Sequence, residues 1–341
     1  MIGERVRIAR EICRLTQLDL AERTGVPLGT IGWIESGRTV APLEDQIERI
    51  AAATGFPTSF FHLGTLPDLP EGHFRKLKRG TAKDEKQLRA QVRLVVELVQ
   101  RAEQQVRLPN VAIEAIAKDV SLDDIEDIAQ KVRDRLGVGD RDPIPNFMRA
   151  VERAGVIVVR LSIDLEDHDS YSTWPDHSLD GRPIIAISAG HPGDRDRANV
   201  GHELGHLVLH TLRPAVDGDL AETEAWRFAG AILFPREAAE ELMQPPVTLR
   251  VLMAAKATYG TSIAFNAKRA LDLHIITKEQ FVSLRKQLSA RGWTKEEPVD
   301  VACEKPVLMP KIVEHMGGDG STKERAERMH VQTFFLPLIS A

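Results

Sequence analysis

The stretch RANVGHELGHLVLH, residues 197–210, constrains this chain more than any other segment. Its apolar residues predict a buried helix. In a helix, His202 and His206 project from one face, about 6 Å apart along the axis. Buried imidazoles need polar partners. The stretch therefore predicts either a metal site or core histidines that hydrogen-bond to carbonyl groups.

The order HExxH favours the metal site. Two imidazoles one turn apart suit two ligands of a tetrahedral zinc ion, Zn²⁺. Glu203, next to His202, is placed to accept a proton from water rather than to bind the ion. His210 lies two turns, about 12 Å, from His202 and is too far to bind the same ion. We interpret His210 as a helix-end cap.

A third ligand must come from another element. Residues 221–235, AETEAWRFAGAILFP, predict a helix whose core face holds Ala225 and Ala229. Glu222 shares that face, whereas Glu224 lies nearly opposite. We therefore expect Glu222 to be the third ligand and keep Glu224 as the alternative; both are surface acids if no metal binds.

Length and composition limit the class of protein. A chain of 341 residues can form two to three domains, and 43% hydrophobic with 28% charged residues is typical of a soluble globular protein. No apolar run could span a bilayer, and the start of the chain has no apolar export signal. Cys13 and Cys303 exclude a disulfide framework and a cysteine-rich zinc finger. We expect a cytoplasmic protein without membrane association.

The first sixty residues predict four short helices, at 2–14, 16–25, 28–37 and 42–55. Gly25 suits the tight turn between the second and third, which together form a helix-turn-helix. The pattern TQLDLAERTGVPLGTIGWIESG at 16–37 resembles the Cro/CI-like (XRE) DNA-binding domain over about residues 2–62.

The resemblance implies that the second helix of the pair enters the major groove of double-stranded operator DNA, as a homodimer on paired half-sites. It implies eight DNA-binding positions: Thr16, Gln17, Leu28, Gly29, Gly32, Trp33, Arg38 and Thr39. Few of these side chains can hydrogen-bond to base edges, so sequence reading relies on Gln17, apolar contact and DNA shape. The two glycines and Trp33 leave open a reuse of the domain for protein contacts.

The middle of the chain predicts a connector, a long helix at 85–107, helices at 123–137 and 144–155, and strands at 156–161 and 182–188. The second strand is a candidate edge for pairing with an extended substrate. Residues 71–107 hold ten Lys and Arg against five acids. This local excess of positive charge is either a solvated helix face or a surface for phosphates or a partner.

The segment RANVGHELGHLVLH, followed by E-x-E-A-x-x-F-A-x-x-I-L-F-P, resembles the ImmA/IrrE metallopeptidases over about residues 140–245. The resemblance implies a zincin-like zinc endopeptidase whose relatives cut transcriptional repressors during stress or mobile-element induction. The connector FRKLKRG, residues 74–80, is similar to that of family members that fuse regulator and peptidase. Trp226 departs from the family, which usually has Asn or Asp there to orient a zinc histidine; its loss could weaken metal binding tenfold or more.

The expected fold is mainly α with a small β-sheet (α+β). We expect an all-α helix-turn-helix domain at 1–65, a basic connector and long helix at 66–110, a zinc peptidase domain at 111–245 and a helical region at 246–341, whose apolar end FFLPLI is core or an oligomer contact. The expected function is a DNA-binding regulator that cleaves a repressor or itself. The rival is a non-enzymatic transcription factor whose peptidase domain senses a ligand or a partner. Candidates for stabilising the oxyanion are Tyr171, His177 and Tyr259.

Overall fold

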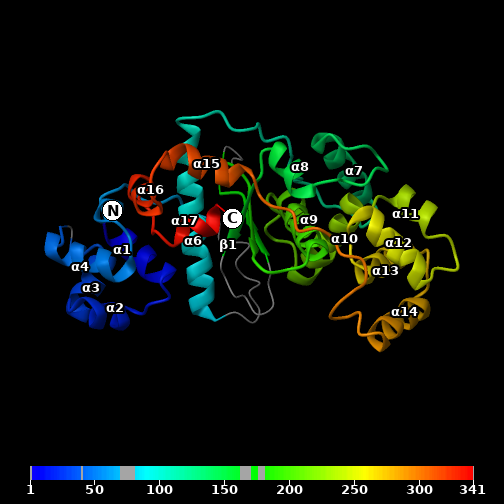
Figure 1. The fold of residues 1–341 in the computed structure, drawn as a ribbon, viewed down its shortest axis with the longest axis horizontal. Helices are drawn as coiled ribbons and strands as arrows, with labels where there is room; N and C mark the ends of the chain where they lie inside the picture. The colour runs from blue at the N-terminus through cyan, green and yellow to red at the C-terminus, as the bar shows by residue number, and fades with distance from the viewer. Residues whose placement is uncertain (1, 40, 70–80, 162–169, 176–180, 341) are drawn as a thin grey trace.

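The computed structural model describes residues 2–39, 41–69, 81–161, 170–175 and 181–340. It is mainly helical with one three-stranded sheet, which confirms the expected fold class. The molecule is elongated: five short helices lie at one end, the sheet lies near the middle, and a second group of helices forms the other end (Figure 1). Within the described ranges, no helix is both long and apolar enough to cross a membrane.

The N-terminal end contains the predicted helix-turn-helix. A capping box between Thr16 and Asp19 starts its first helix, and Gly25, with φ of 67°, ends it. The buried faces of α1 and of the helix pair form one core with α4 and α5. The five helices are α1 (Ile2–Ile12), α2 (Gln17–Thr24), α3 (Leu28–Glu35), α4 (Glu44–Thr54) and α5 (Thr58–Phe61).

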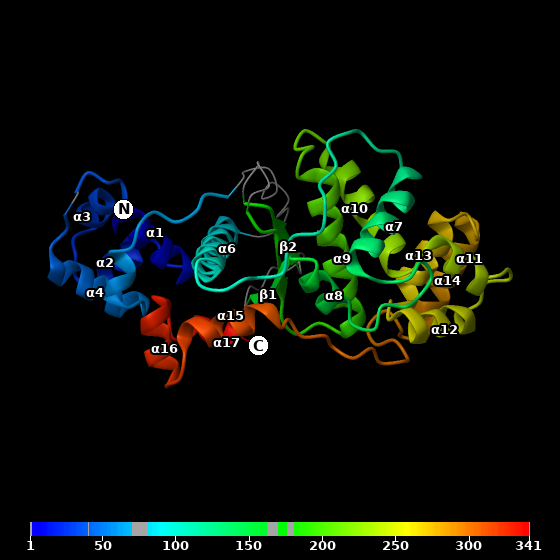
Figure 2. The ribbon, with the colours of Figure 1, turned by 90° about the horizontal axis from the view of Figure 1, so that it is seen from above.

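The long helix α6 (Ala82–Glu103) stands between the N-terminal helices and the sheet (Figure 2). Its apolar residues join one hydrophobic core with α1 on one side and with β1 and β2 on the other. Buried ion pairs add to the contact with α1, where Arg5 binds Glu97 and Arg93 binds Glu4. This helix therefore links the two halves of the molecule through packing.

The sheet has the strand order β1–β3–β2, with β1 (Ile157–Leu161), β2 (Ser170–Thr173) and β3 (Ile184–Ser188). Strand β1 runs parallel to β3, with Ile157 opposite Ile184, and β2 runs antiparallel to β3, with Tyr171 opposite Ala186. The expectation that residues 182–188 form an edge strand is wrong, because β3 pairs on both sides. Among the described strands β2 is an edge, and the sequence pattern did not predict this strand.

Two helices pack together beside the sheet: α9 (Gly193–His210), which carries the HExxH motif, and α10 (Gly218–Leu233). Helix α9 begins at Gly193, four residues before the expected start. A Cβ atom at Gly205 would lie only 3.1 Å from the backbone of Ala225, so glycine allows the two helices to approach closely. Helices α7 (Asp124–Leu136) and α8 (Phe147–Arg153) cover this pair and β1.

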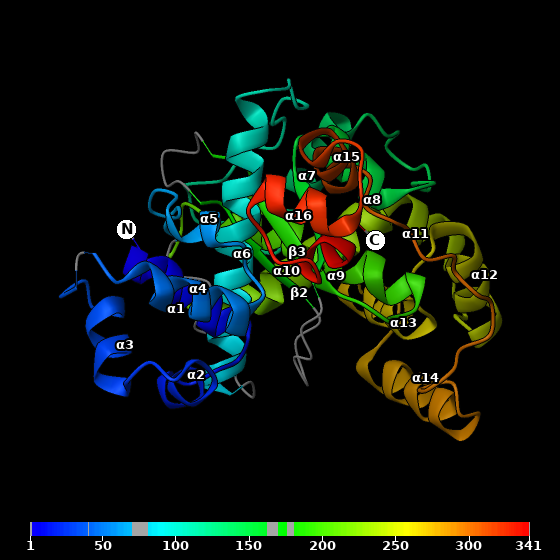
Figure 3. The same cartoon turned by 60° about the vertical axis from the view of Figure 1, so that its left-hand side comes forward.

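The C-terminal region is helical, as expected. Four helices, α11 (Arg236–Leu242), α12 (Leu249–Tyr259), α13 (Ile263–Asp272) and α14 (Lys278–Ala290), form the far end of the molecule. The chain then returns to α6 and β1 as α15 (Leu308–Gly317), α16 (Thr322–Met329) and α17 (Phe335–Ile339) (Figure 3). The apolar end FFLPLI is largely core, because Phe335, Leu336 and Ile339 are buried, while Phe334 is exposed.

Candidate functional site

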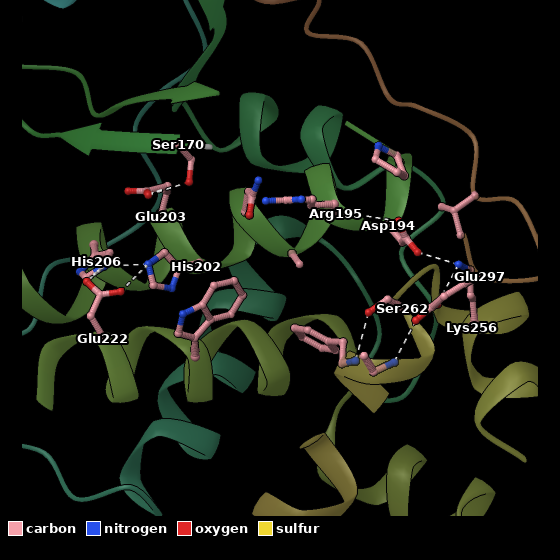
Figure 4. A pocket seen from close by; sticks show the side chains of 18 of the residues that line it. Ser170, Asp194, Arg195, His202, Glu203, His206, Glu222, Lys256, Ser262 and Glu297 are labelled. Atoms are coloured by element: carbon pink, nitrogen blue, oxygen red, sulfur yellow. Dashed lines mark hydrogen bonds and ion pairs between the residues drawn. The ribbon is translucent and has the colours of Figure 1, made fainter. Parts of the chain in front are cut away.

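Three side chains converge beside the N-terminal half of α10: His202 and His206 from α9 and Glu222 from α10 (Figure 4). The two Nε2 atoms lie 3.0 Å apart. Each is 3.4 Å from a carboxylate oxygen of Glu222. The two histidines of the HExxH motif therefore face one point, and an acid from a later helix faces it too.

This donor set fits a divalent metal ion. Two imidazole nitrogens and a carboxylate are common ligands of zinc, and ligands at about 2.0–2.1 Å in a tetrahedron lie about 3.4 Å from one another. Burial alone would raise the pKa of the Glu222 carboxyl, but hydrogen bonds from His202 and His206 outweigh burial and hold the pKa well below its usual range. Glu222 therefore faces the histidines as an anion, the form that binds metal.

Glu203 points away from this triad toward the edge strand β2. Its two carboxylate oxygens accept hydrogen bonds from the hydroxyl groups of Ser170, at 2.9 Å, and Ser172, at 2.6 Å. These two serines alternate with Tyr171 along the strand, so their side chains share one face of the sheet. The carboxylate is therefore held in one orientation beside His202.

Trp226 covers one of the two histidines. Its indole lies against the ring of His202 with the ring centroids 4.3 Å apart and 35° between the planes. The Nδ1 atom of His202 is buried and has no hydrogen-bond partner among the described residues. His202 is thus oriented by ring contact, where a polar residue would have donated or accepted a hydrogen bond.

His206 has a different environment. Its Nδ1 lies 2.9 Å from Nδ1 of His210, and Nε2 of His210 lies 3.0 Å from Glu224. Arg213 is 3.0 Å from the same oxygen of Glu224. The helix-end cap expected for His210 is wrong, because its ring is turned inward between His206 and α10. Glu224, the alternative ligand, lies with His210 and away from the triad.

Comparison with family models matches two parts of the chain. Residues 2–59 match a helix-turn-helix domain, and residues 151–271 match the IrrE N-terminal-like domain of peptidase family M78. The chain joins a helix-turn-helix domain to an IrrE-like peptidase domain. A search of curated proteins finds no match.

The IrrE-like domain contains a cavity of about 1100 Å³ that includes the metal-ligand candidates and Glu203. From there it extends along α9 to α13 and α14 and to the segment that leads back toward α15. Lys256, bound to Asp194 and Glu297, forms one wall, and Trp226, Phe265 and Trp293 contribute apolar surface. A cavity of this size accommodates more than a metal ion and a water molecule.

In the helix-turn-helix domain none of the eight predicted DNA-binding residues is buried. Leu28 and Trp33 are about half exposed, at 45% and 54%. No atom would lie within 4 Å of a Cβ at Gly29, so this part of α3 is bare backbone. The exposed part of the second helix therefore combines two large apolar side chains with bare backbone at Gly29 and offers few groups that could hydrogen-bond to base edges.

Gln17 is the polar group best placed on this face. Its Nε2 donates to Glu35 at 2.8 Å, and Glu35 also binds Arg10 through both carboxylate oxygens, at 2.7 and 2.8 Å. The Gln17 oxygen lies 3.9 Å from the position of a Cβ at Gly32. Because Gly32 has no side chain, there is room beside it for the Gln17 amide. The hydrogen bond to Glu35 fixes the direction of this amide.

Several arginines of α6 donate hydrogen bonds to carbonyl groups of neighbouring segments of the protein. Arg93 is buried and donates to the carbonyl oxygens of Leu66 and Pro67, and Arg101 donates to that of Met329. Other predicted members of the basic run, at positions 75, 76, 78 and 79, lie outside the described residues. Within the described part, the arginines tie α6 to its neighbours.

The candidates for oxyanion stabilisation differ in position. The expectation for Tyr171 is wrong: it alternates with Ser170 and Ser172, so its side chain faces the core shared with α6 and not Glu203, and burial raises the pKa of its phenol well above the usual range. Tyr259 donates to the carbonyl oxygen of Arg141 at 3.1 Å and does not line the cavity. His177 lies outside the described residues.

Proposed function

We propose that this protein is a DNA-binding regulator whose IrrE-like domain hydrolyses peptide bonds in a regulatory protein, with zinc bound by His202, His206 and Glu222. The observation that carries the proposal is the convergence of two Nε2 atoms and a carboxylate within 3.4 Å, next to a second carboxylate held by two serines. A merely structural histidine pair would not require Glu203 at this position.

A zinc ion in this site would supply a Lewis acid that polarises the peptide carbonyl and acidifies water. Glu203 is the general base: it accepts a proton from the attacking water and returns it to the leaving nitrogen. Ser170 and Ser172 hold its carboxylate toward β2, the strand proposed below to pair with the substrate, because each donates a hydroxyl hydrogen bond to one oxygen.

Strand β2 is the proposed docking site for an extended substrate. It is an edge among the described strands, so its outer backbone groups are suited to β-pairing. The same strand holds Glu203 through its serines. A substrate paired with β2 would therefore lie next to the general base.

Metal analysis of the full chain tests the proposed centre. We expect about one zinc ion per chain, which His202→Ala abolishes because it removes one of three ligands. His315→Ala, on α15, is the control and should retain zinc. Glu203→Gln should retain zinc but lose cleavage of repressor-type proteins, because an amide accepts no proton in this range of pH.

The same variant decides between the enzyme and a sensor. The contact of Trp226 with His202, which leaves Nδ1 without a polar partner, favours a weakened site that binds a ligand or partner without hydrolysis. Metal binding without any cleavage that depends on Glu203 would support the sensor and reject the peptidase.

For the helix-turn-helix domain we propose operator binding as a homodimer, with the eight predicted residues facing DNA. Gln17→Ala should weaken binding to a duplex selected from random sequences by about 1–3 kcal/mol, because its directed amide would be lost. Leu122→Ala, an exposed leucine outside this domain, is the control. Gel-shift titrations at several salt concentrations measure affinity, which should fall as salt rises. Equal affinity of the Gln17 variant would reject its role.

A further inference from the structure

The two histidines of the proposed metal site differ in what lies behind them. His202 has an indole against its ring and no hydrogen-bond partner for Nδ1 among the described residues. Behind His206 lies a buried chain of polar contacts that runs through His210 and Glu224 to Arg213. The side chains of these last three residues are at most 6% exposed, so water does not substitute for their mutual contacts.

We propose that His210 is a positioning residue which, with Glu224 and Arg213, fixes the tautomer and ring direction of His206 as a metal ligand. This inference rests on the proposed metal site and adds to it a dedicated support for one of the two histidines.

The positions of the imidazole protons support this role. A neutral imidazole has one N–H, so a His206 that offers the lone pair of Nε2 to a metal carries its proton on Nδ1. That proton can be donated only to an acceptor, which is Nδ1 of His210 at 2.9 Å. His210 then carries its own proton on Nε2 and donates it to Glu224 at 3.0 Å.

Arg213 completes this series of contacts with an ion pair to Glu224. The guanidinium is 3.0 Å from the same carboxylate oxygen that accepts from His210 and also donates to the carbonyl oxygen of Leu209 at the end of α9. Each proton in this series of hydrogen bonds therefore has one position, and the lone pair on Nε2 of His206 is directed at the triad. A hydrogen-bonded partner of this kind raises the basicity of a ligating histidine and restricts its ring.

Zinc affinity of the full chain, measured by competition with a chromogenic chelator, tests the inference without any substrate. We expect His210→Leu to weaken zinc binding about ten- to a hundredfold, because it removes the acceptor for His206. His210→Gln should recover most of the affinity, since its amide can accept from His206 and donate to Glu224. His210→Asn carries the same amide on a shorter side chain and should recover less.

Thr211→Val is the matched control. It removes a buried hydrogen bond of the next residue, from Thr211 to the Leu207 carbonyl at 2.8 Å, without touching the chain behind His206. Urea unfolding of the metal-free proteins reports the structural cost of each change, and the absorption spectrum of bound Co²⁺ reports the ligand geometry. Thr211→Val should leave zinc affinity and the Co²⁺ spectrum unchanged.

These zinc measurements distinguish a failure of the positioning role of His210 from a failure of the metal site. Zinc affinity of His210→Leu equal to the wild type would overturn the positioning role while leaving the metal site intact. If that variant does not fold, equal affinities of the Gln and Asn variants and the wild type would overturn it instead. A wild-type chain that binds no zinc would overturn the proposed metal centre itself, and the positioning role with it.

Discussion

Gly205 shows at the scale of one residue how the metal-ligand candidates come together. It stands between His202 and His206 on α9, where a Cβ atom would lie 3.1 Å from the backbone of α10. Without a side chain there, α10 can bring Glu222 within 3.4 Å of both histidines. Gly205 is one of the two variable positions of HExxH, and the close packing of α9 against α10 favours glycine there.

We predict that Gly205→Ala destabilises the protein by about 1–3 kcal/mol, because the new Cβ would lie 3.1 Å from backbone atoms of Ala225 and the helices would have to separate. Gly29→Ala is the matched control in another helix: its Cβ would meet no atom within 4 Å, so alanine should stabilise α3 by up to about 1 kcal/mol. Urea unfolding measures both. Equal stability of Gly205→Ala and the wild type would show that the helices yield without cost.

At the scale of elements, Glu126 joins three helices. From α7 it binds Arg269 of α13 through both oxygens, at 2.6 and 2.7 Å, and Arg227 of α10 at 3.1 Å. Burial would raise the pKa of Glu126, but the two arginines outweigh burial and hold the pKa below its usual range. The carboxylate thus fixes the helix that carries Glu222 against its neighbours.

We predict that Glu126→Gln lowers the free energy of unfolding at pH 7 by about 3–5 kcal/mol, because it leaves the buried Arg269 unpaired. Since the folded-state pKa is depressed, the stabilisation is complete above the unfolded pKa of about 4.3 and is lost as the pH falls through the folded value. The difference between wild type and variant should therefore shrink below pH 4 in urea titrations. Glu241→Gln, in an exposed pair with Arg141, is the control and should change stability little. A difference that is independent of pH would contradict the ionic origin.

At the scale of the whole molecule, the C-terminal helices connect the two functional parts. They pack on β1 and α6, and two polar side chains of the segment between α16 and α17 contact the N-terminal helices. Gln332 is fully buried and donates to the carbonyl oxygen of Thr54 at the end of α4, and His330 lies 2.7 Å from the hydroxyl of Ser59. The N-terminal domain therefore contacts α6 on one side and the segment between α16 and α17 on another.

We predict that Gln332→Ala destabilises the protein by about 1–3 kcal/mol, because it leaves the buried carbonyl of Thr54 with only the weak thiol donor of Cys13, at 3.3 Å. Amide hydrogen exchange should become faster in α1 and α4, far from position 332 in sequence. Gln130→Ala, which removes a partly exposed glutamine on α7, should leave exchange in these helices unchanged. Unchanged protection of α4 in Gln332→Ala would mean that the N-terminal domain is held by α6 alone.

The sequence by itself determined the helix-turn-helix, the HExxH helix and the fold class. These depend on local rules: helical periodicity places residues four apart on one face, and capping residues and glycines end helices. The same periodicity placed Glu222 on the face of α10 that holds Ala225 and Ala229. The roles proposed for these residues in metal and DNA binding, and the boundaries at 65, 110 and 245, stay predictions.

Only the tertiary structure decided the contacts between elements distant in sequence. Strand β2 is short and polar, so it lacks the alternation of apolar residues that would have predicted a strand. Only its pairing with β3 brings Ser170 and Ser172 to Glu203. The inward turn of His210 toward Glu224 depends on how α9 packs against α10. Spacing along a helix fixes direction within that helix, whereas the partner of a side chain depends on which other element packs against it.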